Sequence, residues 1–277
     1  MTVLAVACDL LVEARSRRWI LALVAAATLL LVVLALGLRF EVVDGALAAT
    51  RLFGGDLGTD VRAVDVALRP LFVGASQLLF YAGILFGIVA TADFAPTLLA
   101  PGRVEYLLAL PVRRWHLLAG TFVGVEALVL AGAAYGGIGL TLVLWAKTGV
   151  LSAGPALAAI AAAIGFAPVY AAMLVAAIVA RSAALSGGAG LLVFIAGVVA
   201  GNRVALSDVF EEGASRTAFL AVTAVLPRLS ALSDLAANVA AARPLRAASA
   251  VPLVLGTLVF ALALLAVGVD RFDRRDY

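Results

Sequence analysis

Cysteine, histidine and lysine are almost absent from this chain of 277 residues, which has one of each: Cys8, His116 and Lys147. A single cysteine excludes an internal disulfide, and one cysteine with one histidine cannot form a Cys/His metal cluster. Lys147 stands in WAKTGV without the glycine spacing of a phosphate-binding loop, so we expect no ATP hydrolysis in this polypeptide. A G-x-S-x-G nucleophile motif is also missing. We therefore predict no catalytic residues, no metal and no cofactor in this chain.

Charge is also scarce. Charged residues make up 13% of the chain and hydrophobic residues 65%, whereas a soluble domain has about 25% and about 45–50%. A globular core cannot hide this excess. The net charge is +3, but the arginines cluster at the ends of apolar runs, where they meet lipid headgroups. We predict the lipid bilayer as a partner and no nucleic acid.

Long apolar runs define the fold class, because a helix needs about 20 apolar residues to cross a bilayer. The sequence predicts an all-α polytopic membrane protein that forms one domain over residues 1–277, with six transmembrane helices at about 19–38, 70–92, 117–146, 155–180, 183–202 and 250–269. The first run follows three arginines but is longer than the apolar region of a signal peptide, so we interpret it as a retained span.

The segments between the spans predict further elements. Residues 1–18 mix leucines with charges, which favours an interfacial helix or a plain lead-in to the first span. Residues 39–69 form a solvated outer loop. Thr217 to Leu226 is too short to span and predicts a re-entrant or interfacial segment, which an amphipathic helix follows at the outer surface, on Leu229, Leu232, Leu235 and Val239.

Small residues predict close packing of the bundle, because they let helix backbones approach each other in lipid. Glycine pairs four residues apart occur at 120 and 124, at 132 and 136, and at 197 and 201. The density of arginine and lysine in short loops favours cytoplasmic N- and C-termini.

One carboxylate lies within a predicted span. Glu126 is costly there unless it is paired, protonated or faces water. Tyr81 and Tyr170 are predicted at similar depth and could donate hydrogen bonds to it. Two interpretations remain open: Glu126 belongs to a substrate or proton path, or it is a buried polar lock between helices.

The inner loop from 93 to 116 carries unusual charge. A Pro-Gly turn precedes the helix-forming stretch Arg103 to Leu110, Pro111 stops that helix, and Arg113 and Arg114 precede the next span. Arg103, Glu105 and Tyr106 are left for the cytoplasm, either as a plain positive-inside anchor or as a contact surface.

The stretch FAPTLLAPGRVEYLLALPVRRWHLLAGTFVG, Phe94 to Gly124, resembles the type-2 ABC exporter permeases, the six-span subunits of ATP-binding-cassette transporters. The charged tail DRFDRRDY and the outer segment before the last span are also similar to that family. Ala109 departs from the serine that the family often has.

This resemblance implies a permease of a bacterial inner (plasma) membrane exporter, with ATP and Mg held by a separate ABC ATPase subunit. It implies a homodimer or heterodimer of permeases, and a cytoplasmic coupling helix at Arg103 to Leu110 that docks on the ATPase. The residues it assigns to ATPase coupling are Arg103, Glu105, Tyr106, Leu107, Pro111, Arg113 and Arg114. Two alternatives stay open: a membrane scaffold that transmits force without passing a substrate, and a secondary transporter that uses Glu126.

Overall fold

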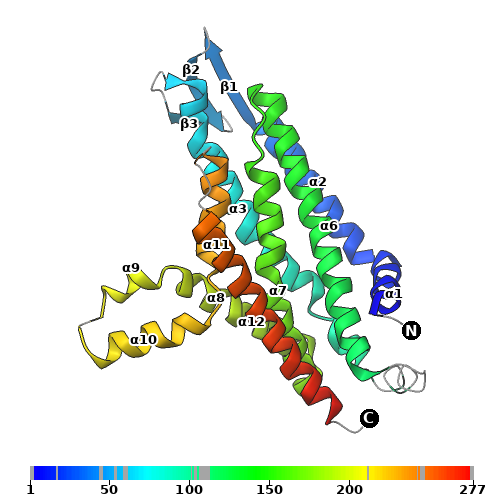
Figure 1. Ribbon diagram of the computed structural model, residues 1–277. Coiled ribbons are helices and arrows are strands. Elements are labelled where there is room, and N and C mark those ends of the chain that lie inside the picture. The colour runs from blue at the N-terminus through cyan, green and yellow to red at the C-terminus, as the bar shows by residue number, and fades with distance from the viewer. Residues whose placement is uncertain are drawn as a thin grey trace.

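The structure is a computed structural model of a helical bundle with a small sheet at one end (Figure 1). Helix α1 (Val3–Ser16) and the C-terminal end of α12 (Ala247–Asp273) lie at the opposite end from the strands. The residues that it describes are 3–16, 18–43, 46–52, 55–58, 62–100, 102, 105, 113–210, 212–241, 243 and 247–274.

Long apolar helices form the bundle. They are α2 (Arg18–Gly37), α3 (Val64–Thr91), α6 (Arg114–Thr148), α7 (Gly154–Ala180), α8 (Ala183–Gly201) and α12. Among the described residues, five helices are long and apolar enough to cross a membrane, or six if a bent pair counts as one span, and α2 contributes a shorter apolar helix over Val24–Gly37. The prediction of a polytopic helical membrane protein is confirmed.

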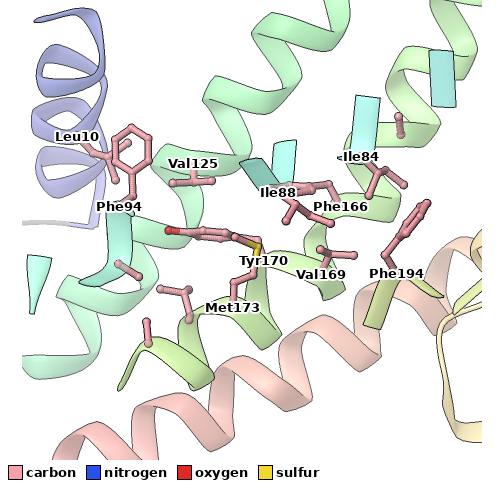
Figure 2. Packing of buried hydrophobic residues seen from close by; sticks show 14 of the residues in the cluster. Leu10, Ile84, Ile88, Phe94, Val125, Phe166, Val169, Tyr170, Met173 and Phe194 are labelled. Atoms are coloured by element: carbon pink, nitrogen blue, oxygen red, sulfur yellow. The ribbon is translucent and has the colours of Figure 1, made fainter. Parts of the chain in front are cut away.

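Helix α7 occupies the centre of the bundle and is the most buried of these helices. It packs against α3, α6, α8 and α12. Its sequence is rich in alanine, which lets neighbouring backbones approach closely. The large buried side chains Phe166, Tyr170 and Met173 fill the space between α7 and its neighbours (Figure 2).

A small antiparallel sheet follows α2, where the sequence predicted a loop. Its strands are β1 (Leu38–Val43), β2 (Ala46–Leu52), β3 (Gly55–Gly58) and β4 (Arg62–Ala63), and β2 pairs with each of the others. Arg39 and Glu41 alternate with Phe40 and Val42, which is the two-residue period of a strand. The sheet adds a short β element to the helical fold.

Helix α1 packs along α6 instead of leading loosely into α2. Val6, Ala7, Leu10 and Ala14 of α1 are buried. A Cβ atom added to Gly120 of α6 would lie 2.5 Å from the Val6 Cβ, and one added to Gly124 would lie 3.1 Å from the Ala7 Cα. This predicted glycine pair therefore receives α1 of the same chain.

The segment before the last span contains α9 (Arg203–Ser207), α10 (Ala214–Val225) and α11 (Leu229–Ala240). Figure 1 shows α9 and α10 extending away from the bundle. Helices α10 and α11 are bent by 67° relative to each other, as a broken span or a re-entrant loop would be.

Helix α11 has the predicted helical structure but a different position. Instead of lying on the outer surface, it packs against α3, α7 and α8, and Leu229, Leu232 and Ser233 are buried. The glycine pair of α8 explains this position, because a Cβ added to Gly197 would lie 2.6 Å from the Leu229 Cγ and one added to Gly201 would clash with the Ser230 Oγ. Two glycines thus form the surface on which α11 sits.

Candidate functional site

The segment between α3 and α6 contains the residues predicted to couple to an ATPase. Glu105 is exposed and has helical backbone. Arg113 is exposed and has extended backbone, with φ −70° and ψ 140°, immediately before α6. Arg103, Tyr106, Leu107 and Pro111 lie outside the described residues. Arg113 and Arg114 lie where α6 begins, at the end of the bundle opposite the strands (Figure 1).

The entry to this segment is anchored in the core. Helix α4 (Phe94–Leu98) follows α3 directly and packs against α7 and α8. Phe94, Ala95 and Leu99 are at most 3% exposed and belong to the main buried cluster. A displacement of the segment at this end would therefore act on α7 and α8 through packed side chains.

The exit of the segment is anchored by Arg114, the first residue of α6. Its Nη1 atom donates hydrogen bonds to the backbone carbonyl oxygens of Phe272, at 3.2 Å, and Asp273, at 3.1 Å. Both carbonyls lie at the end of α12, where backbone acceptors have no partner within the helix. Arg114 therefore joins the start of one span to the end of another.

Glu126 lies in the half of α6 nearer to this end, roughly 18 Å along the helix from Arg114. Its Oε1 atom is buried and has no hydrogen-bond partner among the described residues, and the same holds for the hydroxyl of Tyr170. The carboxylates of Glu126 and Asp93 are close enough to that hydroxyl to act on it electrostatically. The structure thus brings Glu126 and Tyr170 into one neighbourhood without a direct hydrogen bond.

The surroundings of Tyr170 are apolar. Its ring stacks on Phe166 at a centroid distance of 5.9 Å and lies 6.2 Å from Phe122. In Figure 2, the hydroxyl points toward the side where Val125 and Phe94 lie. An ionised carboxylate is costly in a dry site. These surroundings therefore favour a neutral carboxyl group on Glu126 beside the Tyr170 hydroxyl.

Tyr81 is not part of this neighbourhood. It lies beside Ser233 and Asp234 of α11, and its ring makes an edge contact with Phe194 of α8 at a centroid distance of 6.3 Å. Tyr81 and Glu126 were predicted at similar depth in the membrane. They do not meet, because Tyr81 points from α3 toward α8 and α11. The hydrogen bond that the sequence allowed between Tyr81 and Glu126 is absent among the described contacts.

An apolar groove of about 410 Å³ opens between α3 and α8. Its lining residues carry no ionisable side chain: Leu85, Ile88, Val89, Ala92, Ala183, Ala184, Gly187, Gly188 and Leu191. Such a surface suits apolar groups, which it would contact by van der Waals interactions.

The contact between Arg114 and α12 was missed in the sequence, although a signal for it is present. A cation at the first residue of a helix faces the positive end of the helix dipole, at a cost of about 0.3–1 kcal/mol. The C-terminal end of an antiparallel helix is the negative end of its dipole, so its position beside Arg114 offsets that cost.

Among the described residues, no three His, Cys, Asp or Glu side chains come together as metal ligands would.

A family model described as ABC-2 family transporter protein matches residues 7–277, which is nearly the whole chain. No curated protein matches the chain.

Proposed function

Because this chain belongs to the ABC-2 family of transporter proteins, as a multi-pass transmembrane subunit, we propose that it is the permease of an ATP-driven exporter. The match over residues 7–277 carries this proposal. ABC-2 permeases function with ATPase subunits, so a separate ATPase chain would bind ATP and Mg and supply the energy. Closure of that ATPase on ATP would move the permease through its inner segment.

The proposed docking element is the coupling helix at residues 103–110. Three features support it: Glu105 is exposed at this end of the bundle, Arg113 is exposed at the exit, and α4 holds the entry in the core. Glu105 and Arg103 would make charge contacts with the ATPase, and Tyr106 would pack into its groove. A segment whose start is packed in the core and whose middle is exposed is suited to receive force from a partner ATPase and to pass it to the helix bundle.

The proposed assembly is a homodimer or heterodimer of permeases with two ATPases in a bacterial plasma membrane, and the transport path lies between the permeases. We place both termini in the cytoplasm. Helix α1, Arg113, Arg114 and the end of α12 with Arg271 and Arg274 share one end of the bundle (Figure 1). The positive-inside rule assigns such an arginine-rich end to the cytoplasm.

The test is recovery of an ATPase with the tagged permease. The complex isolated from membranes should hydrolyse ATP, and Glu105→Arg or Tyr106→Ala should lower the amount of ATPase recovered by about tenfold, which corresponds to about 1.4 kcal/mol. Glu212→Arg is the matched control. Its side chain is 94% exposed on the projecting α9–α10 segment, so the same charge reversal there should leave recovery unchanged.

Two results would contradict the proposal. One is a permease that purifies from its native membrane without any ATPase. The other is full ATPase recovery and full stimulation in both Glu105→Arg and Tyr106→Ala, because the docking element would then lie elsewhere.

A further inference from the structure

The hydrogen bonds of Arg114 connect two helices that run in opposite directions. Helix α6 begins at Arg114 and α12 ends at Asp273, so the positive end of one helix dipole lies beside the negative end of the other. The guanidinium donates to the Phe272 and Asp273 carbonyls at 3.2 and 3.1 Å. Bonds from a charged donor are roughly twice as strong as neutral ones.

The side chain of Phe272 reinforces the same contact. It is 1% exposed and belongs to the buried cluster that also contains Leu117 and Leu118 of α6. The rest of α12 packs mainly along α7, with Thr257, Ala261 and Gly268 buried, while Leu255, Leu262 and Val267 on its other side are exposed. The hydrogen bonds that tie α12 to the first residue of α6 thus come from its last turn.

We propose that Arg114 is a positioning residue that makes the last span follow the exit of the coupling segment, which is the stretch between α4 and α6 that contains the proposed coupling helix. The inference rests on the proposed function, because it names how a movement of that segment reaches α12. At the entry, α4 passes the movement to α7 and α8 through Phe94, Ala95 and Leu99. At the exit, Arg114 passes it to α12. A movement of the coupling segment is thus passed to α7 and α8 and, at the same time, to the last span, α12.

Spin-label distances in the complex with the ATPase test this role. With Cys8 replaced by alanine, Trp115→Cys and Leu185→Cys form a pair that reports movement of the exit relative to α8. Trp115→Cys and Arg271→Cys form a second pair that reports whether α12 follows. Trp115, Leu185 and Arg271 are exposed and accept labels. Each pair is measured with and without ATP.

In the parent complex, ATP should change the Trp115–Leu185 distance and leave the Trp115–Arg271 distance constant. In Arg114→Ala, the first change should persist, and the second distance should also change with ATP. The population in which both sites move together should fall by about tenfold, as expected for lost charge-assisted hydrogen bonds. Arg114→Lys, which keeps the charge and several donors, should restore most of the common movement.

Arg274→Ala is the control. Like Arg114→Ala, this change removes one arginine from the same end of the bundle. Arg274 bonds to the exposed Asp270 of α12, at 2.8 Å, and none of its described bonds reaches α6. It should behave as the parent. If Arg114→Ala does not yield a folded complex, Arg114→Gln provides the milder change and should also release α12.

A constant Trp115–Arg271 distance in Arg114→Ala or Arg114→Gln, alongside an ATP response of the Trp115–Leu185 pair, would overturn the inference and leave the proposed function intact. A Trp115–Leu185 distance that ignores ATP in the assembled complex would instead contradict the proposed function, and the inference with it.

Discussion

At the residue scale, several hydroxyl side chains in the spans donate hydrogen bonds to backbone carbonyl oxygens. Thr91, Thr121 and Thr141 donate to the carbonyl four residues earlier, at 2.8 Å each. Ser186 and Ser230 instead bond to carbonyls of neighbouring helices. Glu126 differs, since its Oε1 is buried and has no partner among the described residues. In lipid, such a carboxylate is costly when ionised.

A Glu126→Gln variant should fold and keep at least the parent's melting temperature in detergent. The amide fills the same volume and has no charge to desolvate. Phe122→Ala, four residues earlier on the same helix, gives a destabilised reference, because it removes a large, partly buried side chain that packs against the core. A melting temperature of Glu126→Gln close to that of Phe122→Ala would show that the carboxylate is ionised and paired. Unchanged transport by Glu126→Gln would identify Glu126 as a structural lock.

At the element scale, close approach of helices depends on a few glycines. The interface of α1 with α6 needs Gly120, because a Cβ there would also lie 2.9 Å from the Val3 carbonyl oxygen. Gly132, farther along α6, has no atom within 4 Å of an added Cβ. Gly120 and Gly132 both lie in α6, but Gly120 faces α1 closely and Gly132 faces open space.

Gly120→Val should loosen α1 and destabilise the protein by about 1–3 kcal/mol, the usual effect of overpacking, whereas Gly132→Val should not. Both variants place the same β-branched residue in α6, so its helix propensity cancels from the comparison. Thermal unfolding in detergent measures the difference, and limited proteolysis near residue 16 shows whether α1 has detached. Equal stability of the two variants would mean that α1 does not rest on Gly120 in solution.

At the scale of the whole molecule, the bundle has two distinct ends. One end holds α1, α4, the start of α6 and the end of α12, and the other holds the sheet and the turn between α6 and α7 (Figure 1). A chain with one exposed cysteine, Cys8 on α1, offers a direct test of which end faces the cytoplasm.

A membrane-impermeant maleimide should label Cys8 in inside-out vesicles and leave it unlabelled in intact cells. Leu151→Cys in a Cys8→Ala background should give the reverse pattern, because Leu151 is 69% exposed in the turn at the opposite end. Labelling of Cys8 from outside intact cells would reverse the orientation and place the proposed coupling helix on the wrong side for an ATPase.

Much of the fold follows from the sequence, because lipid leaves few choices. An apolar run of about 20 residues in a bilayer must satisfy its backbone within a helix, so the sequence predicted a polytopic helical membrane protein, and the structure confirms it. The glycine pairs at 120 and 124 and at 197 and 201 also marked real close contacts. Their partners were unpredictable, since small residues show that something approaches but not which helix does.

The candidate site was predicted in part. The sequence placed charge in the loop between the second and third spans, and Glu105 and Arg113 are exposed there. Similar depth suggested that Tyr81 and Tyr170 both meet Glu126, but depth along a helix does not fix the direction of a side chain. Tyr81 faces α8 and α11, and Tyr170 shares a neighbourhood with Glu126.

The sequence by itself determined that the chain spans a membrane in helices and carries a charged loop between two of them, because these properties depend on local hydrophobicity and charge. The tertiary structure decided that α11 enters the bundle, that residues after α2 pair as strands, and that Arg114 holds the end of α12. These contacts join positions far apart in the chain, up to 159 residues for Arg114 and Asp273, and no local pattern encodes such a partner.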